Sequence, residues 1–286
     1  MKSSETDPFI VLRILPLDKD KKEMHLGFIG TGHITAALVE GLCTISEPPE
    51  NILVSPRNTA NASRLAAKFS RVKVAQNNQA VIDGSEIIFL ALHPQIAPAI
   101  LPQLLFRQDQ RIVSLIAATP IALIRKLTGT VQHVFRAVPL PSVARHVGPI
   151  VLYTDNARIG DIFDKIGKLF VVASEKHLSL LAAVTALISP FFTLMEETAG
   201  WAAAAGIEKQ TANDYTASMF HALATRALDM PPSCFAELAQ EAATPGGLNE
   251  QALGVIRQNG GFKAFRAALD SVAVRLGEGP PHRRRK

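Results

Sequence analysis

The sequence is poor in cysteine, and this shortage excludes proteins held together by disulfides or by cysteine-bound metals. Its two cysteines, Cys43 and Cys234, lie far apart in a chain of 286 residues. They provide neither a disulfide framework nor a spacing typical of a metal site. We therefore predict a reducing, cytoplasmic location and no metal centre.

An excess of charge is missing from most of the chain. The net charge is +5, and the last five residues, HRRRK, carry three arginines and one lysine. A nearly neutral body does not favour a nucleic-acid surface. We predict that residues 279–286 form a solvated basic tail, and an electrostatic contact of this tail with nucleic acid or a membrane is the alternative.

Long apolar runs without polar residues are also absent. The run FIVLRILPL within residues 1–23 is too short to span a membrane and lacks a signal-peptide cleavage pattern. We expect an unstructured leader there, with Met24 as an internal start. The uncharged stretch 178–195 borders on the length of a membrane helix, but it contains serine, threonine and proline. It predicts a helix buried in a core or a subunit interface, not a membrane anchor.

The chain is rich in short apolar runs, which alternate with helical patterns up to about residue 174. Hydrophobic residues make up 48% of the chain, ample for a sizeable core. The expected strands are 25–30, 51–57, 72–75, 86–92, 111–118, 133–138 and 149–153. The expected helices between them are 34–42, 59–69, 77–84, 96–104 and 120–127. This order predicts an α/β domain with a parallel sheet covered on both faces.

After residue 174 the sequence becomes rich in alanine and leucine and predicts helices only. These are expected at 175–204, 208–228, 232–242, 248–258 and 261–276. The predicted organisation is thus a leader over 1–23, an α/β domain over 24–174, an all-α domain over 175–278 and the tail. The helical domain has too much apolar surface to leave bare, which predicts at least a homodimer.

The stretch GFIGTGHI places Gly30 and Gly32 between an apolar strand and a helix. In a dinucleotide-binding turn the first glycine permits the tight bend and the second lets the backbone approach the pyrophosphate. The charge of the pyrophosphate then lies at the helix N-terminus. The third glycine of the pattern is replaced here by Thr35. We predict a Rossmann turn that binds a nucleotide.

The end of the second strand indicates which nucleotide binds. The sequence VSPRN has no carboxylate to hold the ribose 2′-hydroxyl of NAD, but it offers Ser55, Arg57 and Asn58. Arginine can bind phosphate with two hydrogen bonds, which suits the 2′-phosphate of NADP. NADP(H) is therefore the expected cofactor, with NAD(H) as the alternative, and an arginine in a surface turn is the functionless alternative for Arg57.

Several stretches together resemble the pyrroline-5-carboxylate reductase family over about residues 24–278. They are GFIGTGHI, ILVSPR, IIFLALHPQ, SLIAATP, VFRAVPLPSV, AAAAGI, ATPGGLNEQAL and NGGFKAFRAALDSVAVRLGE. The resemblance implies an N-terminal Rossmann domain, a C-terminal helical domain that dimerises, and reduction of a cyclic imine to L-proline with NAD(P)H.

The resemblance also implies roles for individual residues. The cofactor would be bound by Gly30, Thr31, Gly32, His33, Ile34, Ser55, Arg57, Asn78, Ala91, Leu92, His93, Pro94, Ile116, Ala117 and Ala118. Gly246, Gly247, Leu248 and Asn249 would approach the substrate carboxylate through backbone N–H groups at a helix N-terminus.

The chain departs from the family at the substrate side. The family usually has lysine in place of His93, MPN in place of Val138, Pro139 and Leu140, and PGGTT in place of PGGLN. Because lost donors change the discrimination of a polar site, a reductase of another imine or carbonyl acid is an alternative, as is a non-catalytic NADP-binding regulator. The sequence shows no Ser-His-Asp set and no paired carboxylates, and hydride transfer to an iminium requires neither. We assign no catalytic residue.

Overall fold

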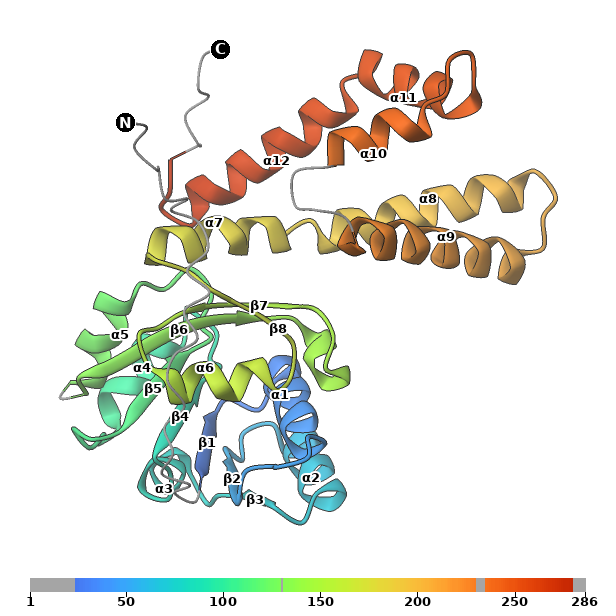
Figure 1. Cartoon of the computed structure of the whole chain (residues 1–286). Helices are drawn as coiled ribbons and strands as arrows, with labels where there is room; N and C mark the ends of the chain where they lie inside the picture. The colour runs from blue at the N-terminus through green and yellow to red at the C-terminus, as the bar shows by residue number, and fades with distance from the viewer. Residues whose placement is uncertain (1–23, 130, 230–234, 280–286) are drawn as a thin grey trace, which may run out of the picture. The chain divides into compact units, whose positions relative to one another are not determined.

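The computed structural model describes residues 24–129, 131–229 and 235–279, so the predictions for residues 1–23, Cys234 and 280–286 lie outside the described residues. The described chain forms two compact units, the first ending at Ala182 and the second beginning at Ala183 (Figure 1). The change in composition near residue 174 therefore coincides with the start of a helix whose first turns still pack in the first unit.

The first unit is a sheet of eight strands with helices between them. The strands are β1 His25–Ile29, β2 Asn51–Val54, β3 Val72–Val74, β4 Ile87–Leu90, β5 Arg111–Ser114, β6 His133–Pro139, β7 Pro149–Tyr153 and β8 Lys168–Val171. The helices are α1 His33–Cys43, α2 Thr59–Lys68, α3 Asn78–Asp83, α4 Ala97–Ile100, α5 Ile121–Thr128 and α6 Ala157–Asp164, followed by the first turns of α7 Glu175–Thr185, which crosses the boundary between the units. Two short 3₁₀ helices, η1 Leu101–Gln103 and η2 Pro141–Arg145, complete it.

The strand order is β3-β2-β1-β4-β5-β6-β7-β8. The pairs from β3 to β6 are parallel, as the alternation of strands and helices predicts. The sheet departs from the predicted parallel arrangement at β7, which runs antiparallel to β6. The connection between them holds only η2 and a turn with His146 in the left-handed region, and this is too short for the crossover that a parallel pair needs.

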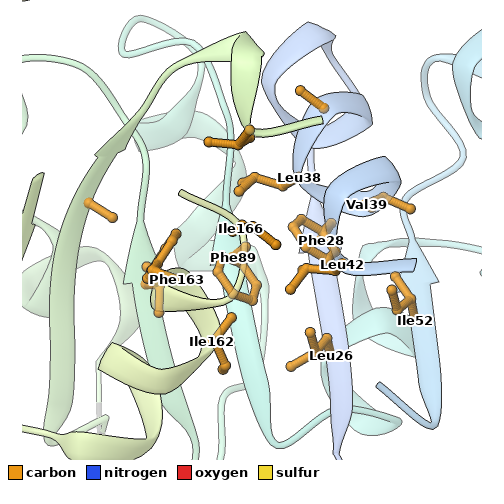
Figure 2. Packing of buried hydrophobic residues seen from close by; sticks show 14 of the residues in the cluster. Leu26, Phe28, Leu38, Val39, Leu42, Ile52, Phe89, Ile162, Phe163 and Ile166 are labelled. Carbon is orange, nitrogen blue, oxygen red and sulfur yellow. The ribbon is translucent and has the colours of Figure 1, made fainter. Parts of the chain in front are cut away.

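Both faces of the sheet are covered, because successive side chains of each strand point to opposite faces. Leu26 and Phe28 of β1 face a cluster that includes residues of α1, α2 and α6 (Figure 2). Ile29 faces a second cluster with residues of α3, α4 and α5. Phe28 stacks on Phe89 of β4 with ring centroids 4.5 Å apart. These two clusters hold the strands that carry the site.

Helix α6 and strand β8 are elements that the sequence analysis did not assign. Asn156 caps α6 by accepting a hydrogen bond from the N–H of Ile159, and Phe163 packs edge-on against Phe89. The sequence signal was present: an asparagine precedes apolar residues at helical spacing, and the apolar run of β8 follows.

The second unit is helical. Its helices are α8 Ile188–Ala204, α9 Lys209–Asp229, α10 Phe235–Ala242, α11 Leu248–Gln258 and α12 Gly261–Arg275. The single helix expected over 175–204 is interrupted by a turn at Ala186 and Leu187, so that Pro190 lies in the first turn of α8. This position suits proline, because the N–H groups of a first helical turn have no partner within the helix.

Large apolar side chains are exposed on α8, among them Phe192 and Trp201, which are 62% and 76% exposed. Within the described residues, the span Glu175–Ala204 has the length and apolar composition of a membrane helix. A core or interface helix satisfies the same test, so the finding is weak support for a membrane span.

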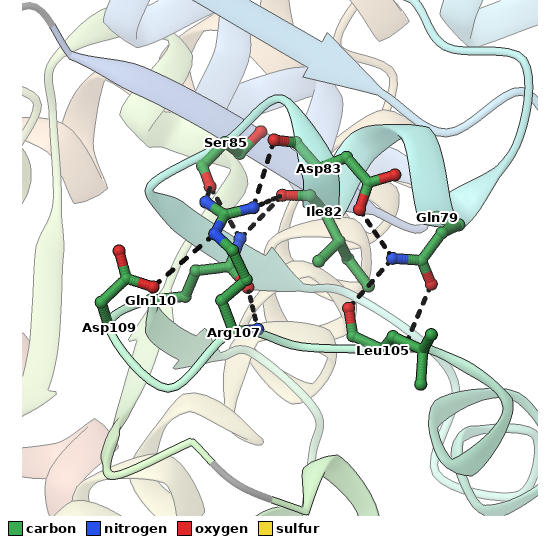
Figure 3. Close-up of polar contacts among 8 residues, drawn as sticks. All are labelled: Gln79, Ile82, Asp83, Ser85, Leu105, Arg107, Asp109 and Gln110. Atoms are coloured by element: carbon green, nitrogen blue, oxygen red, sulfur yellow. Dashed lines mark hydrogen bonds and ion pairs between the residues drawn. The ribbon is translucent and has the colours of Figure 1, made fainter.

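A polar cluster ties the end of α3 to the segment that precedes β5 (Figure 3). The amide of Gln110, which is 1% exposed, donates to the carbonyl oxygens of Ile82 (2.7 Å) and Ser85 (2.8 Å). The guanidinium of Arg107 donates to Ser85 and Asp83. Carbonyls at the end of a helix lack some of the donors available inside it, so these side chains add donors to the buried carbonyls of Ile82 and Ser85.

We predict that Gln110→Ala lowers the free energy of unfolding by about 2 kcal/mol, because two hydrogen bonds to buried carbonyls are lost. Urea denaturation measures this. Gln103→Ala is the matched control: its amide donates to the carbonyl of Ala99 at the surface. Its cost should stay within about 0.5 kcal/mol, and equal costs for the two variants would contradict the role given to Gln110.

Candidate functional site

The site is formed where the parallel strands β1, β4 and β5 end. Because their carboxyl ends meet at one edge of the sheet, the segments that follow them are brought to the same edge. These segments contain Gly30–Gly32, Ala91–Pro94 and Ile116–Ala118. The strand order reverses between β1 and β4, and in such sheets ligands bind at this point.

The turn after β1 has room for glycine alone at its first position. Gly30 has a φ of +96°, and a Cβ atom there would overlap the carbonyl oxygen of Ala91. Gly32 begins α1, and a Cβ atom there would meet nothing within 4 Å. No side chain of the described residues caps α1 at Gly32. The backbone at this helix N-terminus is therefore open to an anion.

Three hydroxyl groups hold this turn in place. The Gly30 N–H donates to Ser55 Oγ (2.9 Å), and the Thr31 hydroxyl donates to the Ser55 carbonyl (2.6 Å). The Thr35 hydroxyl donates to the Gly30 carbonyl (2.6 Å), which gives this departure from the glycine pattern a structural role. Ser55 is 1% exposed. We therefore revise its expected role: it supports the turn from beneath, and its hydroxyl is not offered to a phosphate at the surface.

A cavity of about 400 Å³ lies beside the turn. It is lined by Gly30, Thr31, Arg57, Asn58, Thr59, Ala60, Ala91, Leu92, His93 and Ile96. Arg57 is exposed and makes no hydrogen bond or ion pair with another described residue. Asn58 caps α2 by accepting from the N–H of Asn61. The rim thus combines a free guanidinium with the N-terminus of α2, and both favour a phosphate.

The structure brings together most of the expected cofactor residues but not all of them. Gly30, Thr31, Arg57, Ala91, Leu92 and His93 line the cavity, while Gly32, His33 and Ile34 belong to the adjoining turn and first helical residues. Asn78, Pro94 and Ile116–Ala118 are outside the lining. Thr59, Ala60 and Ile96 are lining residues that the sequence analysis missed. Their signal was positional: Thr59 and Ala60 begin α2, which follows β2, and Ile96 precedes α4, which follows β4.

The loop between β5 and α5 contains a backbone outlier. Ala118 has a φ of 52°, which is uncommon for a residue other than glycine. Ile116 is buried and donates its N–H to Ser114 Oγ, and the Thr119 hydroxyl donates to the Ala117 carbonyl. Such conformations persist where the surroundings impose them, and they gather at functional sites.

In the second unit, the PGG loop uses two of its backbone donors internally. The N–H of Gly246 donates to the Glu250 carboxylate (2.7 Å) and that of Gly247 to the Thr244 carbonyl (2.9 Å). The Asn249 amide donates to the Ala242 carbonyl, and Leu248 is 85% exposed. Among the four residues expected to contact substrate, only the N–H groups of Leu248 and Asn249 have no partner within the described chain.

Among the described residues, no group of three or more His, Cys, Asp or Glu side chains is placed to hold a metal ion. Burial raises the pKa of the Cys43 thiol to about 11. This thiol is therefore protonated at neutral pH and is a poor nucleophile or ligand.

Two family models match the chain. The family described as NADP oxidoreductase coenzyme F420-dependent matches residues 25–118, and that described as pyrroline-5-carboxylate reductase dimerisation matches residues 175–278. A pyrroline-5-carboxylate reductase of Pseudomonas aeruginosa is 26% identical over 266 residues, covering 88% of this chain and 96% of that protein.

Solved structures give the same result for the fold. A pyrroline-5-carboxylate reductase from Streptococcus pyogenes superimposes with a TM-score of 0.78 at 20% identity, covering 88% of this chain and 98% of the other. A pyrroline carboxylate reductase of Plasmodium falciparum with NADP bound gives a TM-score of 0.77 at 16% identity, covering 88% and 97%. The predicted fold class, a Rossmann domain followed by an all-α domain, is confirmed.

The two glycines of the turn allow a matched test of its geometry. Gly30→Ala should lower the free energy of unfolding by about 3 kcal/mol, through both steric overlap and its positive φ. Gly32→Ala, at an open position with ordinary φ, should change it by less than about 1 kcal/mol. Thermal and urea denaturation of both variants would check this, and a stable Gly30→Ala protein would show that the turn is not held against Ala91.

Proposed function

We propose that the chain is a member of the pyrroline-5-carboxylate reductase family and reduces 1-pyrroline-5-carboxylate to L-proline with NADPH, since it matches the dimerisation model of that family and its relatives over most of their length. One observation carries the proposal: a dinucleotide turn with an open helix N-terminus stands in a chain that matches such reductases over nearly their whole length. The enzyme is an oxidoreductase that acts on a C=N bond.

The adenosine half of the cofactor is proposed to occupy the cavity beside the turn. The residues present fit this half, because Gly32 leaves space for a pyrophosphate and the first turn of α1 offers its N–H groups. The free guanidinium of Arg57, with Asn58 and Thr59 beside it, would hold the 2′-phosphate of NADP. NAD(H) would lack the group that Arg57 binds.

The nicotinamide half is proposed to lie along the segments after β4 and β5. These are Ala91–Pro94 and Ile116–Ala118, with Asn78 contributing from the start of α3. When bound, the reduced nicotinamide supplies the hydride. The residues of the chain bind and orient the two reactants and exclude water, which is the contribution that hydride transfer needs from a protein. His93 is exposed on the cavity rim, and we assign it no proton transfer.

The substrate carboxylate is proposed to meet the N-terminus of α11. The PGG loop remains the proposed contact through residues 246–249, with the free N–H groups of Leu248 and Asn249 as the donors. This loop and the apolar Val138–Leu140 segment differ from the family pattern, so they are the places where a different imine would be accommodated. No residue is proposed as a catalytic acid.

We propose that the functional domains span 24–174 and 175–278 and that the chain works as a homodimer or larger homo-oligomer in the cytoplasm. The match to a dimerisation domain and the exposed apolar side chains of α8, such as Trp201, support self-association. If the purified chain sediments as a single species with the mass of a monomer, the proposed self-association is wrong.

The deciding experiment follows the oxidation of NADPH by absorbance, with pyrroline-5-carboxylate as the acceptor and an acceptor-free control. We expect turnover with conversion to proline, identified by mass spectrometry. Turnover only with another cyclic imine would move the substrate assignment. Binding of NADPH without turnover on any imine would favour a regulatory protein instead.

Arg57→Asp tests the cofactor assignment. It should raise the KM for NADPH at least tenfold, since a charge-assisted contact is worth roughly 1.5–3 kcal/mol, while the KM for NADH changes little. Arg71→Asp is the control, because this arginine directly precedes β3 and therefore lies at the amino ends of the strands, away from the site at their carboxyl ends. An equal loss for both cofactors in Arg57→Asp would remove Arg57 from the 2′-phosphate site.

A further inference from the structure

Arg136 is a buried cation with a single partner. It lies on β6, its side chain is 6% exposed, and it donates to Glu175 Oε1 at 2.7 Å. Among the described residues, no other hydrogen bond or ion pair of its side chain is found. A buried charge of this kind requires its counter-ion, so Glu175 is held in one position.

The same carboxylate oxygen accepts a second hydrogen bond, from the N–H of Ile121 at 2.8 Å. Ile121 is the first residue of α5, whose N-terminal cap is Pro120 and has no side-chain acceptor. The first N–H groups of a helix need a partner from outside it. Glu175, the first residue of α7, therefore caps α5 from 54 residues further along the chain.

The bond to Ile121 fixes one end of the loop that joins β5 to α5. Its other end is fixed at Ser114, whose hydroxyl accepts from the Ile116 N–H. Between these points lies Ala118 with its positive φ. A residue in this conformation is maintained by its surroundings, and the bond to Glu175 is the tie that comes from a distant part of the first unit.

We propose that Glu175 is a positioning residue for cofactor binding: by accepting from Ile121, it sets the Ile116–Ala118 loop against the nicotinamide half, and Arg136 holds its carboxylate in place. The inference rests on the proposed function, because that function puts the loop beside the nicotinamide. Glu175 touches neither cofactor nor substrate in this scheme. It acts through the first N–H of α5.

The test compares two ligands of the full-length protein, NADP⁺ and 2′,5′-ADP, by titration calorimetry. The smaller ligand reaches only the adenosine side. Glu175→Ala should weaken NADP⁺ binding roughly tenfold, the scale of one lost charge-assisted hydrogen bond, and leave 2′,5′-ADP binding within about twofold. Glu175→Gln retains an acceptor oxygen and should recover most of the NADP⁺ affinity.

A double variant separates positioning from charge compensation. Glu175→Ala leaves Arg136 buried without a partner, which itself destabilises the fold. Arg136→Met with Glu175→Ala removes that charge and should recover the melting temperature, while the selective loss of NADP⁺ affinity remains. If the double variant binds NADP⁺ like the wild type, Glu175 merely neutralises Arg136 and the proposal is wrong.

The matched control is Glu86→Ala. Glu86 pairs with Arg158 at 3.0 Å and is 29% exposed, as Glu175 is, but it precedes β4 at the other edge of the sheet. It should lower stability without changing the ratio of the two affinities. The inference about Glu175 is wrong if Glu86→Ala changes the ratio of the NADP⁺ and 2′,5′-ADP affinities, or if Glu175→Ala lowers both affinities equally. Either result leaves the proposed function standing. A wild-type protein that binds neither ligand overturns the proposed function as well.

Discussion

The close approach of β1 to β4 at the carboxyl edge of the sheet is the constraint on which the rest of the structure depends. Gly30 passes the Ala91 carbonyl with no space for a side chain, and its own N–H and carbonyl are bonded to Ser55 and Thr35. One turn thus joins β1, β2, β4 and α1. Because these contacts point inward, the turn leaves the N-terminus of α1 facing outward, with its backbone donors unused by side chains.

The site is built mainly from backbone, and its polar side chains act mostly on the protein itself. Ser55, Thr31 and Thr35 hold the turn, and Gln110 satisfies carbonyls at the end of α3. Arg57 is the exception, an exposed guanidinium with no described partner. This division suits hydride transfer, in which the cofactor supplies the chemistry and the protein supplies geometry. It also explains why no catalytic residue stands out in the sequence.

Much of the fold was predictable, because strand and helix periodicities are local and survive in the sequence. The β–α alternation, the position of the turn and the helical second part follow from that pattern. The antiparallel direction of β7 was missed although the sequence carried its signal, since the segment between the expected strands 133–138 and 149–153 is too short for a parallel crossover. The break at Ala186 was missed because helix propensity is continuous across it, and Phe163 shows that an unassigned α6 contributes to the core.

The site could be predicted where it requires a backbone conformation that depends on glycine. It could not be predicted where it depends on hydrogen bonds between residues far apart in the sequence. Gly30 is visible because only glycine tolerates its position, and Gly32 because a pyrophosphate must approach the backbone there. The direction of the Ser55 hydroxyl and the bond from Ile121 to Glu175 instead arise from tertiary contacts. The same distinction separates the two ligand sides. A pyrophosphate bound by backbone demands a fixed turn. In the proposed function, the PGG loop has the Gly246 N–H already in use and offers a carboxylate only the N–H groups of Leu248 and Asn249, and the side chains around it can change without loss of the fold.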